Sequence, residues 1–134
     1  MQNTFKKTLL ATAAATLIAG TAHAEIKVGV ILGFTGPIES LTPAMADSAE
    51  LAFTEASNSG LLLGGETITA VRADSTCVDA SAATAAAERL VNSDGVAAIM
   101  GADCSGVTGA IAKNVGAPNG VAMVSPSATS PGLS

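Results

Sequence analysis

The chain has 134 residues, of which 6 are lysine or arginine and 11 are aspartate or glutamate, so its formal net charge is −5. An acidic chain without a cluster of basic residues is unlike proteins that bind nucleic acid or anionic membrane surfaces. Its one histidine is His23, so the rest of the chain lacks both the commonest general base and the commonest transition-metal ligand.

The first 24 residues have the pattern of a secretory signal peptide. Lys6 and Lys7 precede an apolar run over residues 9–20, and Ala22-His23-Ala24 places small residues at the two positions that a signal peptidase reads. The run is shorter than the ~20 apolar residues of a membrane span. We therefore expect cleavage after Ala24 and a soluble periplasmic product, with four basic and eleven acidic residues and a net charge of −7.

The first half of the mature chain reads as strand, helix, strand. Residues 26–31 form a short apolar, β-branched run that ends at Gly33, as in a buried parallel strand. Thr42 followed by Pro43 predicts the cap and first residue of a helix, whose apolar positions recur at helical spacing until Gly60. A second strand is expected over residues 67–74.

The second half repeats the alternation. Asp79 is suited to cap a helix that ends at Asp94-Gly95, and residues 96–100 predict a third buried strand. A weak helix is expected over residues 106–114, ended by Gly116 and Pro118, before a fourth strand over residues 121–124. The order βαβαβαβ predicts an α/β fold, a doubly wound parallel sheet with helices on both faces. Complete sheets of this type usually have about five or six strands, so we expect residues 25–134 to be a truncated part of a domain.

Three loops carry the candidate binding residues. In open α/β sheets, ligands bind beyond the carboxyl ends of the strands. The loops that leave these ends contain Phe34-Thr35-Gly36-Pro37, Asp103-Cys104-Ser105-Gly106 and the stretch from Ser125 to Thr129. Ser105 starts a predicted helix, where free N–H groups favour an anion such as a carboxylate. Each loop alone is also consistent with ordinary turn and cap residues, but their convergence on one edge favours a ligand site.

An enzyme or a metal protein is disfavoured, and no cofactor is expected. Cys104 or Ser105 would need a base to act as a nucleophile, and no histidine or suitably placed lysine is present. The spacing of Asp74, Asp79 and Asp103 fits no calcium loop, so these residues are interpreted as helix caps or solvated surface.

Cys77 and Cys104 are the two cysteines of the chain. In an oxidising compartment, two cysteines are most simply explained by one disulfide. Both follow strands at the same edge of the predicted sheet, which allows contact without establishing it, because a bridge requires Cα atoms within ~7 Å. Two free buried thiols remain the alternative.

Together these residues resemble the leucine/isoleucine/valine-binding family of periplasmic receptors. The resemblance rests on Ile26-Lys27-Val28-Gly29-Val30, Thr35-Gly36-Pro37, Cys77, Gly101-Ala102-Asp103-Cys104-Ser105 and the stretch from Ser125 to Pro131. It covers nearly all of the mature chain, and the Cys-Ser pair and the Ser-Pro-x-Ala-Thr-x-Pro stretch are its more specific parts. It implies the two-lobed type I periplasmic binding fold, of which residues 25–134 would be the N-terminal part of lobe 1.

The resemblance also implies roles for individual residues. Ser105 would bind a ligand carboxylate through its hydroxyl and backbone N–H, and Thr129 would add its hydroxyl and N–H. Ser127 would offer its backbone carbonyl to the ligand ammonium. Leu41 would line the side-chain pocket, where family members often carry an aromatic residue. A Cys77–Cys104 bridge matches the family pattern and would brace the loop of Ser105.

The implied function is that of a periplasmic solute-binding component of an ABC transporter. Its partners would be a branched-chain or related amino acid, or an amide or urea-type ligand, and the membrane permease subunits, with no nucleic acid. The alternative is an extracellular amino-acid-sensing domain of a signalling protein. The sequence itself leaves the ligand and the oligomeric state open.

Overall fold

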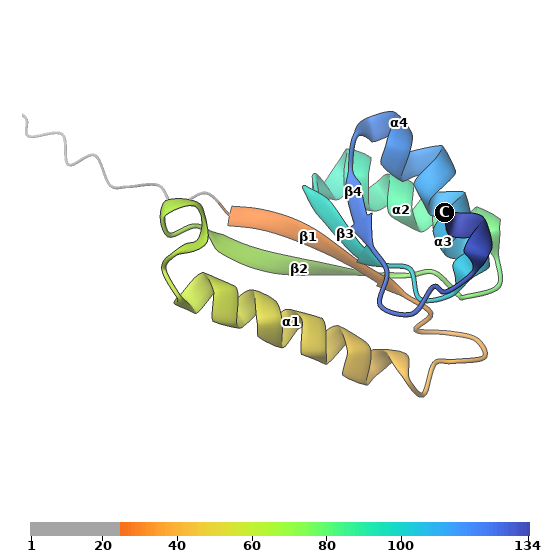
Figure 1. Cartoon of the computed structure of the whole chain (residues 1–134), viewed down its shortest axis with the longest axis horizontal. Helices are drawn as coiled ribbons and strands as arrows, with labels where there is room; N and C mark the ends of the chain where they lie inside the picture. Colours follow the sequence, from red (N-terminus) through yellow and green to blue (C-terminus); the bar gives the residue numbers. More distant parts are fainter. Residues whose placement is uncertain (1–24) are drawn as a thin grey trace, which may run out of the picture.

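The computed structural model describes residues 25–134, which form a parallel four-stranded sheet with helices on both faces (Figure 1). The strands lie in the order β2-β1-β3-β4, and each neighbouring pair is parallel. Their bounds are Glu25–Leu32 (β1), Thr67–Asp74 (β2), Ala98–Gly101 (β3) and Ala122–Val124 (β4). The predicted fold class is confirmed, whereas the predicted signal peptide lies outside the described residues.

The helices are divided between the two faces of the sheet. Helix α1 lies on one face, and α2 and α3 lie on the other (Figure 1). The α-helices are Thr42–Asn58 (α1), Ala80–Arg89 (α2), Ser105–Ile111 (α3) and Ala117–Asn119 (α4). The π-helical turns are Leu90–Asp94 (η2) and Ala112–Gly116 (η3), and the 3₁₀ turns are Leu62–Gly64 (η1) and Pro131–Leu133 (η4). Within residues 25–134, no helix is long and apolar enough to cross a membrane.

Strand β1 is the centre of the core because it is covered on both faces. Ile31 is fully buried against the α2 and α3 side, where it joins the cluster that contains Leu90 and Ile111. Val30 and Leu32, whose side chains alternate with that of Ile31, pack on the α1 side. Each such buried side chain contributes about 1.5–3 kcal/mol to folding. Burial on both faces explains why the second half of β1, residues 28–32, carries no polar side chain.

The path of the chain sets a topological switch point between β1 and β3. From β1 the chain passes through α1 to β2 on one side, and then returns through α2 to β3 on the other side of β1. Crossovers that wind in opposite directions leave a crevice at the carboxyl ends of the two central strands. The loops after β1 and β3 are therefore the natural place for a ligand.

The start of α1 differs from the predicted capping arrangement. Thr42 is the first helical residue and Leu41 occupies the cap position, where no side chain caps the helix. The Thr42 hydroxyl is buried and donates to the carbonyl of Gly33, at 3.1 Å, instead of accepting from the first turn. Thr42 thus ties α1 to the end of β1. The cap predicted for α2 is confirmed, since the Asp79 carboxylate accepts from the N–H groups of Ser81 and Ala82.

The third helical segment continues past the predicted stop at Gly116 and Pro118. Helical backbone runs through η3 into α4, and the chain leaves it at Gly120, which has a φ of +65°. Gly116 leaves room for Met123, because a Cβ there would lie 2.9 Å from the sulfur of that side chain. Pro118 is accommodated directly after the π-helical turn η3, where the regular α-helical hydrogen-bond pattern is already interrupted.

Candidate functional site

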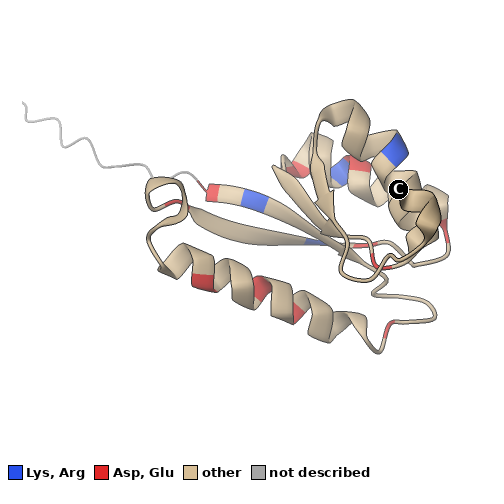
Figure 2. Ribbon diagram, in the orientation of Figure 1, with Lys and Arg blue, Asp and Glu red and all other residues tan. Residues whose placement is uncertain are grey.

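Four loops meet at the carboxyl edge of the sheet, over residues 33–41, 75–79, 102–104 and 125–130. They contain no lysine or arginine. Figure 2 shows the basic residues of the described part on β1, β2 and the helices of the α2 and α3 side, and acidic residues along α1. An anionic group at this edge would therefore be held by hydroxyl and N–H donors.

Ser105 is the residue that connects the third and fourth loops. Its Oγ accepts hydrogen bonds from the backbone N–H groups of Thr129, at 3.1 Å, and Ser130, at 3.2 Å. A serine oxygen has two acceptor positions and one hydrogen to donate. Because both acceptor positions are engaged, the Ser105 hydroxyl is left to act as a donor, as a carboxylate ligand requires. The N–H of Thr129, predicted to face the ligand, points here to Ser105.

The loop of Ser127 is fastened to the loop that follows β3. The Ser127 hydroxyl donates to the carbonyl of Asp103 at 2.9 Å. The Ser125 hydroxyl donates to the carbonyl of Ala102 and accepts from the N–H of Ala128, at 2.9 Å. The structure therefore brings together three of the predicted site residues, Ser105, Ser127 and Thr129.

Leu41 lies at the start of α1, at the end of the first loop. Its side chain is 61% exposed and belongs to neither packed cluster of the core. Its backbone N–H donates to the carbonyl of Ile38, at 2.9 Å, which closes the turn before the helix. Leu41 thus presents an apolar surface at the same edge of the sheet. Within residues 25–134, it makes no hydrogen bond to Ser105, Ser127 or Thr129.

Asp103 is the functional candidate that sequence reasoning missed. The sequence predicts a cap or a surface residue, but only 3% of Asp103 is exposed. Its carboxylate accepts from the N–H groups of Gly33, at 2.9 Å, and Cys104, at 3.0 Å, and from the hydroxyl of Ser75, at 3.3 Å. The signal in the sequence is its position: an acidic residue two positions after the end of a buried strand, among loops of small residues.

The Thr35-Gly36 turn is held by the neighbouring strand. The N–H and hydroxyl of Thr35 donate to the carboxylate of Asp74, at 3.3 and 2.6 Å, and the N–H of Thr76 donates at 2.8 Å. Burial raises the pKa of Asp74, but these hydrogen bonds outweigh it and the net pKa is lowered. Gly36 has a φ of +99°, and a Cβ there would lie 2.6 Å from the carbonyl of Thr76. This turn therefore braces the edge.

The two cysteines form a disulfide at the same edge. The sulfurs of Cys77 and Cys104 are 2.02 Å apart and the Cα atoms 5.2 Å apart. The predicted pairing is confirmed, and the alternative of two free thiols is wrong. The bridge joins the loop after β2 to the residue that precedes Ser105, so it limits the motion of the Ser105 loop.

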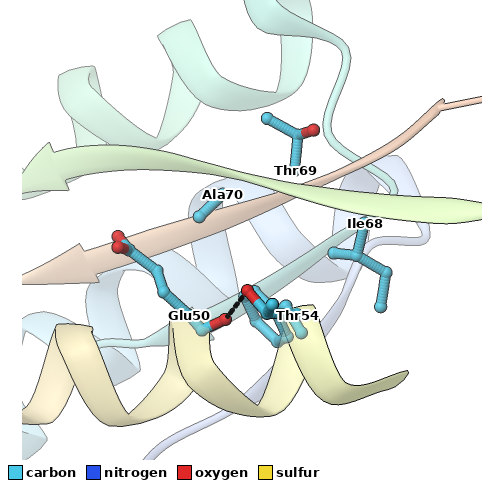
Figure 3. Close-up of a pocket in the computed structure, with 6 residues that line it drawn as sticks. Glu50, Thr54, Ile68, Thr69 and Ala70 are labelled. Carbon is cyan, nitrogen blue, oxygen red and sulfur yellow. Dashed lines mark hydrogen bonds between the residues drawn. The ribbon is translucent and has the colours of Figure 1, made fainter. Parts of the chain in front are cut away.

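A separate hollow of about 300 Å³ lies between α1 and β2 (Figure 3). Its lining residues are Glu50, Phe53, Thr54, Ile68, Thr69 and Ala70. They come from the middle of α1 and the first half of β2, away from the carboxyl edge. The hydroxyl of Thr54 is engaged with the carbonyl of Glu50 (Figure 3). This hollow shares no residue with the candidate site.

Comparison with known proteins agrees with this geometry. The family model of the periplasmic binding proteins matches residues 25–134. The Leu/Ile/Val-binding protein BraC3 of Rhizobium johnstonii is 35% identical over 128 residues, which covers 95% of this chain and 34% of that protein. The Leu/Ile/Val/Thr-binding protein of Salmonella typhimurium is 34% identical, with the same coverage of both chains.

Solved structures show the same relationship. The branched-chain amino acid transporter substrate binding protein LivJ of Streptococcus pneumoniae, in complex with isoleucine, has a TM-score of 0.74 and 31% identity. The match covers 82% of this chain and 31% of that chain. The chain thus spans about a third of the length of the relatives it matches. The relatives that it matches include Leu/Ile/Val-binding proteins. The chain belongs to the periplasmic binding protein family, which consists of solute-binding proteins and not of enzymes.

Proposed function

We propose that the protein binds a branched-chain or related amino acid and delivers it to the permease subunits of an ABC transporter. The observation that carries the proposal is the Ser105 hydroxyl, whose acceptor positions are filled by two backbone N–H groups. Its remaining hydrogen suits an acceptor such as a carboxylate. Relatives with 34–35% identity are named for leucine, isoleucine, valine and threonine, which all carry this group.

The carboxylate would be bound by neutral donors. A ligand carboxylate that leaves water is very costly unless it receives hydrogen bonds. The four loops contain no lysine or arginine, so the hydroxyls of Ser105 and Thr129 would supply these bonds, with the backbone N–H of Ser105. Hydrogen bonds from such groups to an ionised acceptor are about twice as strong as neutral ones. This arrangement suits a zwitterion, which has no net charge.

The rest of the ligand would be recognised by two further residues and a second lobe. The carbonyl of Ser127 would accept from the ammonium group, and the exposed side chain of Leu41 would contact the apolar side chain. In this proposal residues 25–134 are the N-terminal part of lobe 1. The chain covers 34% of its relative BraC3, which leaves room for the second lobe in a protein of that length.

Export to the periplasm is part of the same proposal. Residues 1–24 would be a signal peptide cleaved after Ala24, on the sequence pattern alone. Proteins of this family act outside the cytoplasm, and the disulfide favours an oxidising compartment. N-terminal sequencing of the protein isolated from the periplasm tests this step, and a start at any residue other than Glu25 would contradict the cleavage site.

The ligand is tested by titration calorimetry on the complete protein that carries this sequence. The probes are L-leucine, L-isoleucine, 4-methylpentanoate, which lacks the ammonium group, and 3-methylbutylamine, which lacks the carboxylate. We expect L-leucine or L-isoleucine to bind, and both analogues to bind at least about a hundredfold more weakly, because each leaves buried polar groups unpaired. Binding of urea or acetamide without binding of either amino acid would overturn the proposed ligand class.

The transport role has its own test. Uptake of labelled L-leucine is measured in cells with and without the gene that encodes the protein. Loss of uptake in the deletion strain, with recovery on complementation, is the expected result. Unchanged uptake together with tight binding would favour a sensing role over import.

A further inference from the structure

The one charged side chain in the buried set of residues 25–134 is that of Asp103. We propose that Asp103 is a positioning residue, which fixes the loops of the carboxyl edge so that the Ser105 hydroxyl faces the ligand. This inference rests on the proposed function for its ligand readout. It assigns Asp103 no contact with the ligand.

Asp103 makes hydrogen bonds to all four loops of the edge. Its carboxylate receives the N–H of Gly33 from the loop after β1 and the hydroxyl of Ser75 from the loop after β2. It also receives the N–H of Cys104 in its own loop, and its backbone carbonyl receives the hydroxyl of Ser127 from the loop after β4. Gly33 and Ser75 are 70 and 28 residues away in the sequence, so no local turn explains these contacts.

The first loop is shaped for this contact. A Cβ on Gly33 would lie 3.3 Å from a carboxylate oxygen of Asp103 and 3.2 Å from the Cβ of Cys77. These separations are tighter than most such contacts, so the absence of a side chain at Gly33 lets the carboxylate and the disulfide approach the backbone. The carboxylate and the disulfide therefore act on the same small region, from two directions.

A merely space-filling role would be served better by an apolar side chain. Burying a carboxylate is unfavourable unless its oxygens are hydrogen-bonded, and here three donors converge on it. Few interactions separate the carboxylate of Asp103 from the proposed ligand. Asp103 holds the N–H of Cys104, Cys104 precedes Ser105, and the Ser105 oxygen holds the N–H groups of Thr129 and Ser130.

The main test is Asp103→Asn in the complete protein, with Asp79→Asn as the matched control. Asparagine has nearly the same shape as aspartate. However, its NH₂ group is a donor, and it would replace a carboxylate oxygen that accepts a hydrogen bond. Asp79 also accepts two backbone N–H groups at this edge, yet it caps α2 and has no bond to the other loops. We expect Asp103→Asn to weaken L-leucine binding at least about tenfold, and Asp79→Asn to change it less than about twofold, at a temperature where all variants are folded.

Coupling to Ser105 separates positioning from general stability. If Asp103 acts through Ser105, the effect of Asp103→Asn on binding will be smaller in a Ser105→Ala background than in the wild type. Ser75→Ala, which removes one donor from the carboxylate, should show the same coupling with a loss of about two- to fivefold. Ser75→Ala replaces Asp103→Asn as the test variant if Asp103→Asn does not fold. Wild-type affinity in either folded variant, or losses that simply multiply, would overturn the inference.

Amide hydrogen exchange gives a readout without ligand. We expect the N–H groups of Thr129 and Ser130 to exchange at least about fivefold faster in Asp103→Asn, and at the wild-type rate in Asp79→Asn. Unchanged exchange at both positions would overturn the inference. If the wild type binds neither L-leucine nor L-isoleucine while exchange responds as expected, the proposed function fails and the positioning role of Asp103 stands.

Discussion

Removal of the Cys77–Cys104 disulfide should reduce the free energy of unfolding by about 3.5 kcal/mol. The two cysteines are 27 residues apart in the sequence. Closing a loop of this length lowers the entropy of the unfolded chain by about 12 cal/mol/K, which corresponds to about 3.5 kcal/mol at 25 °C. Since folded domains are stable by about 5–15 kcal/mol in total, a contribution of this size is a large share of the stability of the domain that contains the bridge. The melting temperature should fall on the order of 15 °C.

The assay is urea unfolding followed by circular dichroism, on wild type and on Cys77→Ala/Cys104→Ala. Wild type measured in a reductant should lose the same free energy as the double variant, which controls for the packing of the replaced sulfur atoms. The dependence of the free energy on urea concentration is fitted separately, because the bridge also restricts the unfolded chain. A loss below about 1 kcal/mol in both experiments would refute the loop-entropy argument.

Three further predictions concern single residues. Gly101→Ala should destabilise the fold by at least about 3 kcal/mol in urea unfolding, because φ is +128° and a Cβ would overlap the carbonyl oxygen of Ile31. A loss below about 1 kcal/mol would contradict this geometry. Ser105→Ala should weaken L-leucine binding about ten- to a hundredfold in calorimetry, while Ser48→Ala, an exposed change on α1, should leave it unchanged. Wild-type affinity in folded Ser105→Ala would remove Ser105 from the site. The folded pKa of Asp74 lies below its ordinary value of 3.8, so its stabilisation is present above that pH and is lost as the pH falls through the folded pKa. The melting temperature of Asp74→Asn should therefore differ most from wild type near neutral pH, and a difference that does not shrink as the pH is lowered below 3.8 would be inconsistent with this.

Sequence patterns were sufficient where the determining interactions are local. The bounds of β2 were predicted as residues 67–74, and Asp79 was identified as a cap whose partners are two and three residues away. Strand alternation with helices gave the fold class, because few topologies satisfy that order.

Interactions between distant segments decided the rest. Gly116 reads as a helix stop, but the helical backbone continues past it and Met123 of β4 packs where its side chain would be. Thr42 reads as a cap, but its hydroxyl is used by the carbonyl of Gly33. Asp103 reads as a surface residue because the partners that make its burial possible come from loops far away in the sequence. In each of these cases the deciding contact comes from a residue at least seven positions away, where local sequence patterns give no indication of it.

The central place of β1 has a consequence for the order of folding. The first strand pairs with β2 from residue 67 onward and with β3 from residue 98 onward. The partners of β1 in β2 lie 42 residues further along the chain (Glu25 to Thr67), and its partners in β3 lie 70 residues further (Val28 to Ala98), so each pairing must first close a long loop. Parallel pairings of high contact order form slowly, so β1, whose second half is buried in the folded state, lacks one of its two neighbours until β3 has been added. During that time the nascent chain depends on being kept apart from other copies, since an unpaired apolar strand readily recruits another.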